Sequence, residues 1–292
     1  MKVAGFTIAR NVVKYDYPIL ASIQSVLPLC DHFYIGVGKS DDNTLEVLKS
    51  IDSPKIVIFE TEWDENMFEG GKILAFETNR VIDFIPKEFD WLFYIQADEV
   101  IHENDHEEIR SQMQKYASNP KVDGLLFKYR HFYGSYDYLA DSRAWYKREV
   151  RIIKNNPAIR SFRDAQGFRK NGEEKVNAIA INAYINHYGW VKHPTKMLEK
   201  IQGLASNWTH SKSIGEIADS GSFDYSKIDS LAKYIGTHPK YIQERIKSQN
   251  WKFDTDISKK NFKSLRYRLL MFIESLTGYR IGEYRNFKIV KG

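Results

Sequence analysis

The chain has 292 residues, of which 42% are hydrophobic and 28% charged, and its formal net charge is +5. These values are typical of a globular protein that buries one large core, and they exclude a wholly disordered chain. The charge is too mild to indicate a nucleic-acid-binding protein, and a single cysteine excludes a disulfide framework or a cysteine-based zinc site.

The first half of the chain alternates between strand-like and helix-like stretches. Apolar runs of strand length occur at residues 3–9, 33–37, 55–59, 91–96 and 124–129. Apolar residues with helical spacing occur between them, at residues 19–27, 45–51, 72–84 and 109–116. This rhythm predicts an α/β fold with a mostly parallel sheet flanked by helices. Ligands of such sheets bind beyond the carboxyl ends of the strands.

The pattern changes from about residue 129, where aromatic residues and arginines crowd together. Strand-like pieces follow near residues 151–154 and 178–186, and a helix is predicted to begin near Thr195. More helical segments fill the last hundred residues. We therefore predict one main domain over residues 1–195 and a helical C-terminal extension over residues 196–292.

The sharpest chemical signal is the pair Asp98-Glu99, which follows the apolar run at residues 91–96. Two carboxylates at the end of a buried strand are costly unless a cation meets them. Mg²⁺ and Mn²⁺ prefer oxygen ligands and bind one or two carboxylates together with phosphate oxygens. A solvated turn, in which Glu99 caps the next helix, is the alternative. The local sequence does not decide between them.

With its neighbours, this segment resembles the family 2 glycosyltransferases, which have the GT-A fold of nucleotide-diphospho-sugar transferases. Gln96-Ala97-Asp98 lies where that family has Asp-x-Asp, whose last Asp binds the metal. The resemblance implies that Asp98 binds Mn²⁺ or Mg²⁺. Gln96 departs from the pattern, and it places a neutral amide where an acid often contacts the ribose or the metal.

Further segments carry the resemblance in the order of the family. Arg10-Asn11 ends the first predicted strand, as an Arg-Asn pair near the nucleotide does in the family, and Asn79 lies on the helix before the metal strand. His187 matches a histidine that many GT-A enzymes bring to the metal or the diphosphate. His193 is a second candidate, and a purely structural histidine is the alternative reading of His187.

The loop after the second predicted strand also matches, with one departure. The family usually has an acid there that contacts the nucleobase, and this chain has Gly38. Asp41 or Asp42, in the segment that opens the next helix, is expected to take over that contact. Both are therefore predicted to bind the nucleotide-sugar.

Inverting transfer needs a general base to take a proton from the acceptor hydroxyl. In the related enzymes this base is an acid between the metal strand and the late histidine. Asp164, in a loop-like stretch, is the first candidate and Glu149 is its rival. Arg151 is predicted to neutralise the diphosphate because arginine matches phosphate geometry, and Lys192 and Lys196 are further candidates.

The tail from Lys259 to Gly292 mixes basic and apolar residues. A basic amphipathic helix can lie on an anionic membrane surface, and a helix packed on the domain with an exposed basic face is the alternative. No apolar stretch approaches the roughly 20 residues that cross a bilayer, and the N-terminus lacks the pattern of a signal peptide. The expected location is cytoplasmic, with peripheral contact at the inner face of the membrane left open.

The resemblance implies a metal-dependent, inverting glycosyltransferase that acts on a nucleotide-diphosphate sugar donor and a carbohydrate or lipid-linked acceptor. By family analogy, it acts in cell-surface polysaccharide or lipopolysaccharide assembly. The competing hypothesis is a catalytically weakened relative that binds nucleotide-sugar as a partner in an assembly, and Gln96 and Gly38 motivate it. A dinucleotide oxidoreductase is disfavoured because no G-x-G-x-x-G follows the first strand.

Overall fold

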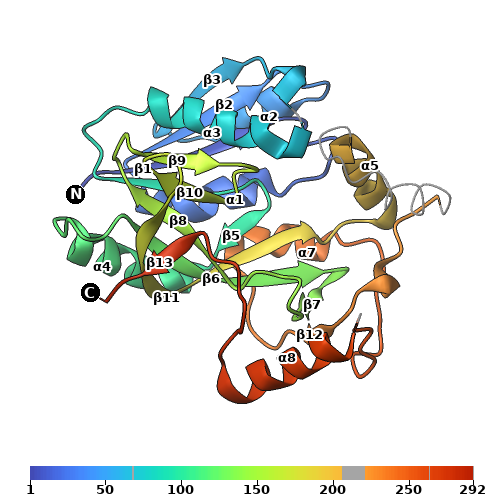
Figure 1. The fold of residues 1–292 in the computed structure, drawn as a ribbon. Helices are drawn as coiled ribbons and strands as arrows, with labels where there is room; N and C mark the ends of the chain where they lie inside the picture. The colour runs from blue at the N-terminus through green and yellow to red at the C-terminus, as the bar shows by residue number, and fades with distance from the viewer. Residues whose placement is uncertain (68, 206–220, 263, 292) are drawn as a thin grey trace.

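The computed structural model of the protein describes residues 1–67, 69–205, 221–262 and 264–291 (Figure 1). Its strands are β1 (Val3–Ala9), β2 (His32–Gly38), β3 (Ile56–Thr61), β4 (Trp91–Tyr94), β5 (Glu99–Ile101), β6 (Gly124–Tyr133), β7 (Ser135–Ala140), β8 (Arg148–Lys154), β9 (Ile159–Phe162), β10 (Gly167–Lys170), β11 (Glu174–Trp190), β12 (Leu231–Lys233) and β13 (Phe287–Ile289). Its α-helices are α1 (Ile19–Val26), α2 (Thr44–Lys49), α3 (Lys72–Phe84), α4 (His106–Tyr116), α5 (Pro194–Ala205), α7 (Gln243–Lys247) and α8 (Leu265–Thr277).

The main sheet has the strand order β3-β2-β1-β4-β8-β6-β11, followed by β10 and β9. Strands β1 to β4 pair in parallel, and so do β6 and β11. Strand β8 is antiparallel to both of its neighbours, β4 and β6, so β6 and β11 run in the same direction as β1 to β4. The predicted α/β fold with a mostly parallel sheet is therefore confirmed.

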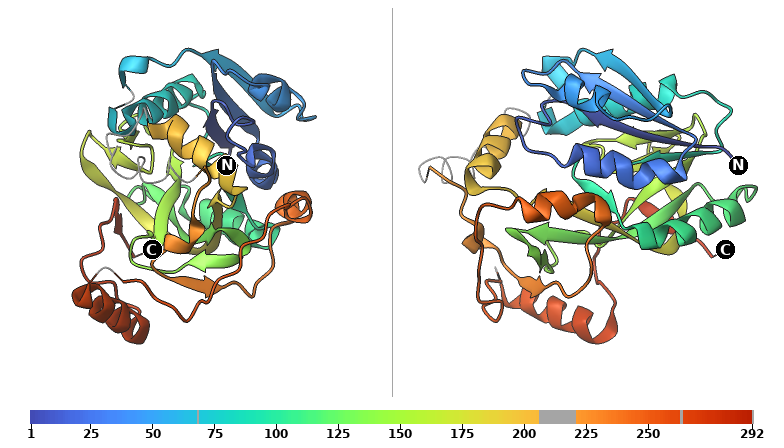
Figure 2. Two further views of the ribbon diagram at one scale, coloured as in Figure 1. Left: turned by 90° about the vertical axis from the view of Figure 1, so that its right-hand side faces the viewer. Right: turned by 180° about the vertical axis from the view of Figure 1, so that it is seen from behind.

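Helices cover both faces of this sheet (Figure 2). Neighbouring residues of a strand point to opposite faces, so Phe33 and Tyr34 of β2 enter two separate cores. Phe33 belongs to the same core as Ile23 of α1 and Ile109 of α4, whereas Tyr34 belongs to the core that contains Val81 of α3. The apolar spacing that predicted these helices is thus the spacing that buries them.

The C-terminal extension is less purely helical than predicted. It contains α5, α7 and α8, but β12 pairs with β7 and β13 pairs with the long strand β11. The last residues of the chain therefore return to the main sheet, and α8 lies at the lower edge of the molecule in Figure 1. The domain boundary at residues 195 and 196 stays a prediction. None of the helices in the described ranges is both long enough and apolar enough to cross a membrane.

The order of the strands defines where a ligand is expected. From β1 the chain first adds β2 and β3 on one side and then β4 on the other, so the order reverses between β1 and β4. The carboxyl ends of strands on either side of such a reversal diverge and leave a crevice. The segments that leave β1 and β4 here begin at Arg10 and Ile95.

Candidate functional site

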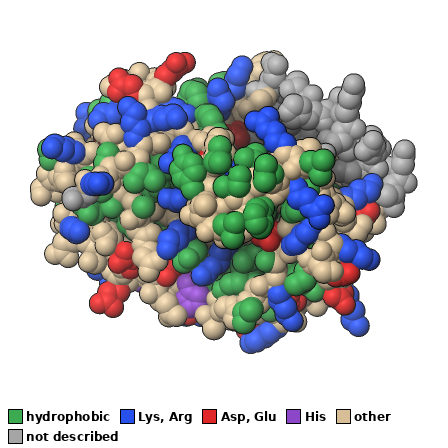
Figure 3. Space-filling model, turned by 60° about the horizontal axis from the view of Figure 1, so that its bottom comes forward, with side chains coloured by type: hydrophobic (Ala, Val, Ile, Leu, Met, Phe, Trp, Pro, Cys, Tyr) green, Lys and Arg blue, Asp and Glu red, His purple; other side chains and the backbone are tan. Residues whose placement is uncertain are grey.

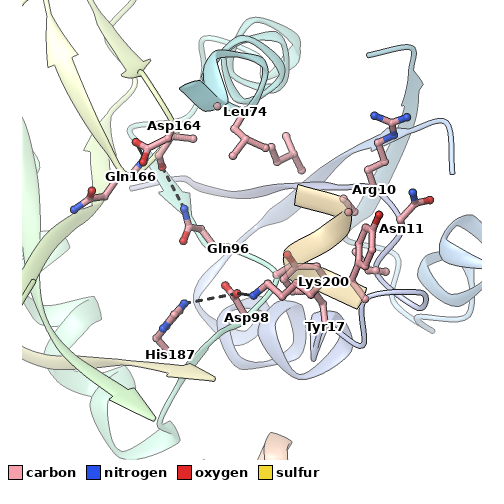
Figure 4. A pocket seen from close by; sticks show the side chains of 18 of the residues that line it. Arg10, Asn11, Tyr17, Leu74, Gln96, Asp98, Asp164, Gln166, His187 and Lys200 are labelled. Carbon is pink, nitrogen blue, oxygen red and sulfur yellow. Dashed lines mark hydrogen bonds and ion pairs between the residues drawn. The ribbon is translucent and has the colours of Figure 1, made fainter. Parts of the chain in front are cut away.

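A cavity of about 840 Å³ lies at the carboxyl ends of β1 and β4 (Figure 4). The predicted site residues that line it are Arg10, Asn11, Asp41, Gln96, Asp98, Asp164 and His187. Among those that do not line it are Asp42, Asn79, Glu149 and Arg151. The structure thus brings together residues that are far apart in the sequence, from the loops after β1 and β2, the β4–β5 turn, the β9–β10 turn and β11.

The two adjacent carboxylates point in different directions. Asp98 faces the cavity, where its Oδ2 is 3.6 Å from Nε2 of His187 and 3.3 Å from Nζ of Lys200. Glu99 points into the core and accepts two hydrogen bonds from Arg151, at 2.9 and 2.8 Å. Arg151 is fully buried, so its guanidinium has no surface with which to contact a diphosphate, and the prediction that it binds the donor is not supported.

Lys200, on α5, is a buried cation beside Asp98. Its Nζ also donates to the carbonyl oxygen of Gly189 at 2.9 Å and lies 4.7 Å from the ring centre of Tyr17. Burial alone would lower the pKa of Lys200, but Tyr17 and Asp98 outweigh burial and raise it. Burial alone would raise the pKa of Asp98, but His187 and Lys200 hold it far below its usual value. Both side chains are therefore charged near neutral pH.

A chain of hydrogen bonds fixes the orientation of His187. His131 Nε2 lies 2.7 Å from the carbonyl oxygen of Tyr146, which can only accept, so this nitrogen carries the proton. Burial, followed by the neighbouring His187, lowers the pKa of His131 well below its usual value, so its Nδ1 is bare. That Nδ1 accepts from Nδ1–H of His187 at 3.2 Å. Nε2 of His187 therefore faces Oδ2 of Asp98, and it presents either a proton to this carboxylate or a lone pair to a cation between the two atoms.

This arrangement suits a cation between Asp98 and His187. Nε2 of His187 and the carboxylate of Asp98 face each other at 3.6 Å, and the positive charge between them comes from a proton on the imidazole or from a metal ion. Ligand atoms of an ion such as Mg²⁺, each about 2.1 Å from the metal, lie roughly 3.0–4.2 Å from one another. In the described ranges, no group of three or more His, Cys, Asp and Glu side chains could hold a metal. One carboxylate and one imidazole would hold such an ion together with oxygens of a bound diphosphate, as Mg²⁺ sites commonly do.

Gly189 leaves the space for this pair. A Cβ atom at this position would lie 2.5 Å from Oδ2 of Asp98 and 2.7 Å from Nε2 of His187. Any other residue at position 189 would therefore displace one of the two proposed ligands. A glycine two residues after His187 is thus required by the geometry of the site, and the sequence alone did not show why it is there.

Asp164 lies in a strained turn on another part of the cavity wall. The residues on both sides of it, Arg163 and Ala165, have positive φ angles of 55° and 57°. Such a conformation costs about 1–3 kcal/mol for each non-glycine residue and is found mainly where function requires it. Gln96 Nε2 donates to the carbonyl oxygen of Ala165 at 3.3 Å, which ties this turn to the strand that leads to Asp98 (Figure 4).

The opposite part of the wall combines a cation and an aromatic ring. Arg10 donates to the carbonyl oxygen of Lys39 at 3.1 Å, and its guanidinium carbon lies 5.4 Å from the ring centre of Trp63. Nε1 of Trp63 is buried and has no hydrogen-bond partner among the residues that the structure describes. A Cβ atom at Gly38 would lie 2.3 Å from this nitrogen, so Trp63 explains why position 38 has a glycine and not an acid.

Asn11 and Asp41 line the cavity but also hold its loops together. Asn11 has a φ of 53°, and its side-chain oxygen accepts from the backbone N–H of Asp41 at 2.8 Å. This bond joins the loops that follow β1 and β2. Both residues are therefore placed at the mouth of the crevice between parallel strands, as the sequence predicted.

Two of the predicted donor contacts have structural partners instead. Asp42 accepts from the backbone N–H groups of Lys14 and Thr44, at 2.6 and 3.0 Å, and so stabilises the start of α2. Asn79 exchanges two hydrogen bonds with the backbone of Ser161, at 3.1 and 2.8 Å, and ties α3 to β9. Neither side chain reaches the cavity.

Glu149, the rival base, is buried beside the cavity. It accepts from Asn286 at 2.9 Å and from Gln166 at 3.4 Å, and Gln166 forms the cavity wall at this point. Burial raises the pKa of Glu149 to about 6. A carboxylate that is enclosed in this way has no path to the proton of an acceptor, and we retain Asp164 as the candidate base.

The remaining basic candidates also lie outside the cavity. His193 bonds Thr195 at 2.8 Å near the start of α5, and Lys196 pairs with Glu199 at 2.6 Å on the surface. Lys192 is buried and donates to the carbonyl oxygen of Asp16. Sequence reasoning missed Lys200. The helical spacing could have indicated it, because Lys200 follows the buried Met197 by three residues and so lies on the same, inward face of α5.

No family model matches the chain, and no curated protein matches it. Among solved structures it is similar to S. aureus TarS, with 16% identity and a TM-score of 0.41 over 70% of this chain and 39% of that one. It is also similar to TarS 1–349 in complex with UDP, with 15% identity and a TM-score of 0.39 over 71% of this chain and 65% of that one. A third is glucosyl-3-phosphoglycerate synthase from Mycobacterium tuberculosis in complex with Mn²⁺, UDP and phosphoglyceric acid, with 14% identity and a TM-score of 0.29 over 44% and 43%. The chain spans less than two thirds of each of these proteins.

Proposed function

We propose that this protein is a glycosyltransferase that moves a sugar from a nucleoside-diphosphate sugar to an acceptor hydroxyl, with Mn²⁺ or Mg²⁺ held by Asp98 and His187. One observation carries the proposal. An ionised carboxylate, an imidazole oriented by a second histidine and a buried ammonium meet in one cavity, at the reversal point of an α/β sheet. With a divalent cation bound, such a cluster is suited to a small anion with several oxygens, because the cation and Lys200 together outweigh the charge of Asp98.

A diphosphate fits the charges of this cluster. When bound, the divalent cation supplies Lewis acidity that stabilises the negative charge on the leaving diphosphate. Lys200 adds a fixed positive charge from the side of α5, where its Nζ is 3.3 Å from Asp98. Because the site is largely buried, each of these charges acts more strongly than it would in water.

Transfer with inversion assigns the base to Asp164. The acceptor oxygen bonds to the anomeric carbon while its proton passes to the carboxylate of Asp164, and the bond from that carbon to the diphosphate oxygen breaks. The strained turn at residues 163–165 holds this carboxylate in the cavity wall, apart from the Asp98 cluster. A base and a leaving group on different walls are what an in-line displacement requires.

The remaining walls suggest where the two substrates lie. Trp63 and Arg10, near the ends of β1 and β2, offer a flat ring and a cation to the nucleoside. Trp145 and Trp190 line the cavity on the side of His187 and offer aromatic surface for an acceptor sugar. Both assignments follow from the chemistry of the walls and are part of the proposal.

The departures that favour a weakened binding protein have structural explanations. Gln96 donates a hydrogen bond to the Asp164 turn, which a carboxylate could not do. Gly38 leaves room for Trp63. We therefore favour the enzyme over the binding partner, which remains the second candidate and is distinguished by turnover.

The first test is a thermal-shift screen of UDP, GDP, CDP and ADP with Mn²⁺ and with EDTA. A nucleoside diphosphate at a hundredfold excess over its Kd is expected to raise the melting temperature by roughly 5 °C in Mn²⁺. The matching nucleotide-sugar should then be consumed. Binding without hydrolysis or transfer would favour the binding partner, and no shift with any nucleotide would refute both readings.

A further inference from the structure

Helix α8 differs from an ordinary surface helix because it exposes its apolar side and buries a charged residue. Its single buried residue is Glu274. Its large apolar residues Leu265, Leu269, Phe272 and Leu276 have 82%, 58%, 59% and 70% of their surface exposed. Their spacing of four, three and four residues places them on one side of the helix. We call these four residues the α8 stripe.

Ion pairs on the inner side fix the rotation of α8. Glu274 pairs with Arg143 at 2.7 Å, with Lys147 at 2.5 Å and with Arg280 at 3.3 Å. If α8 rotated so that the stripe faced inward, Glu274 would lose these three ion pairs, and its two arginine partners would be left buried without a counter-charge. The ion pairs of Glu274 therefore hold the polar side of α8 against the protein and leave the apolar side facing outward.

The segment that carries the α8 stripe is rich in basic residues. Residues 259–292 contain nine Lys and Arg and only two Glu, whereas the whole chain has a net charge of +5. Arg266 and Arg268 are exposed and, at 100° per residue, lie on either side of the stripe. Figure 3, which brings the lower side of the molecule forward, shows apolar side chains beside Lys and Arg side chains on this face.

We propose that the α8 stripe docks this protein on an anionic lipid surface. An apolar stripe flanked by arginines matches a bilayer interface, where apolar side chains enter the acyl boundary and basic ones meet lipid phosphates. A protein partner would need an apolar groove lined with acids, and a second copy of this basic helix would bring like charges together. The charge therefore selects the lipid surface over another copy of the chain.

Helix α8 contacts the loop that forms part of the cavity wall through its inner side. Arg280, just after α8, donates to the carbonyl oxygen of Trp145 at 2.7 Å, and Trp145 lines the cavity. Arg143 and Lys147, which pair with Glu274, belong to the same loop between β7 and β8. Docking through α8 would thus bring the Trp145 wall near the lipid surface, which suits a lipid-linked acceptor. This last step rests on the proposed function, and docking itself does not.

The test is co-sedimentation of the full chain with vesicles of phosphatidylcholine containing 30 mol% phosphatidylglycerol, and with vesicles of phosphatidylcholine alone. The wild type is expected to bind the anionic vesicles at least about tenfold more tightly than the neutral ones, and to lose most binding at 0.5 M NaCl. The double variant Leu269→Glu/Phe272→Glu should weaken binding by roughly tenfold or more. Arg266→Gln/Arg268→Gln should weaken binding to the anionic vesicles alone by a similar factor.

Ile235→Glu is the matched control, because Ile235 is 93% exposed and lies outside α8. It should bind as the wild type does, and all variants should melt within a few degrees of it, since every changed side chain is exposed. Equal binding by the wild type and the Leu269→Glu/Phe272→Glu variant, or no binding by the wild type, would overturn the proposal. So would a wild-type dimer that this variant converts to a monomer in light scattering, because the stripe would then be a protein interface. Nucleotide binding is unaffected in either case, so this result is separate from the test of the enzyme.

Discussion

Replacing Asp164 with Asn is expected to lower turnover by roughly 10²–10⁴-fold, because a general base contributes a factor of this size. The amide keeps the shape of the carboxylate and the turn at residues 163–165, but it does not take a proton from the acceptor. The Kd of the nucleoside diphosphate should change by less than about threefold, since Asp164 lies apart from the Asp98 cluster. Steady-state kinetics and calorimetric titration measure the two quantities.

Glu149→Gln is the matched control for this prediction. Glu149 is the other acid considered for the base, and it is enclosed by Asn286 and Gln166. The variant should keep turnover within a few-fold of the wild type, because no substrate proton reaches this side chain. If Glu149→Gln loses turnover and Asp164→Asn keeps it, the two roles are reversed and the assignment of the base is wrong.

Asp98→Asn should remove the Mn²⁺-dependent part of nucleoside diphosphate binding. Loss of a partner one shell away from a metal commonly weakens binding 10–100-fold, so loss of a direct ligand should cost at least roughly a hundredfold. The variant also leaves the ammonium of Lys200 buried without its carboxylate, which destabilises the fold. Calorimetry with UDP or GDP, in Mn²⁺ and in EDTA, measures the loss.

Lys200→Met distinguishes the contribution of the ammonium group to diphosphate binding from that of the metal. It removes the cation that neutralises Asp98 in the absence of metal, so Mn²⁺ should raise the melting temperature of this variant more than that of the wild type. The double variant Asp98→Asn/Lys200→Met removes both charges and should fold stably without any response to Mn²⁺. An Asp98→Asn protein that binds the diphosphate as tightly as the wild type in Mn²⁺ would rule out the carboxylate as a ligand.

Local patterns were sufficient for the first half of the fold. Apolar runs and helical spacing predicted β1 to β4 and α3, because each of these elements buries the side that its pattern marks. The rule that ligands lie at the carboxyl ends of parallel strands then placed Arg10, Asn11 and Asp98 together. The hairpin of β9 and β10 and its strained turn around Asp164 were harder to predict from the sequence. Arg163 and Ala165 have positive φ angles, and no glycine marks these two positions.

The rest of the site depends on contacts between distant residues. Asp98 and Glu99 have the same chemistry in sequence, and only the buried Arg151 shows which of them points into the core. Lys200 belongs to α5 and lies 102 residues after Asp98 in the sequence. His131 orients His187 through a bond between neighbouring parallel strands, β6 and β11. No spacing rule predicts such pairs before the sheet order is known.

The central claim is that Asp98 and His187 hold a divalent cation that grips a diphosphate. The most direct measurement is anomalous diffraction from a crystal of the wild-type protein grown with Mn²⁺ and UDP or GDP. We predict a manganese peak about 2.1 Å from Oδ2 of Asp98 and from Nε2 of His187, with diphosphate oxygens completing its shell. A nucleotide bound in the cavity while Asp98 stays paired with Lys200, and manganese lies elsewhere, would contradict it.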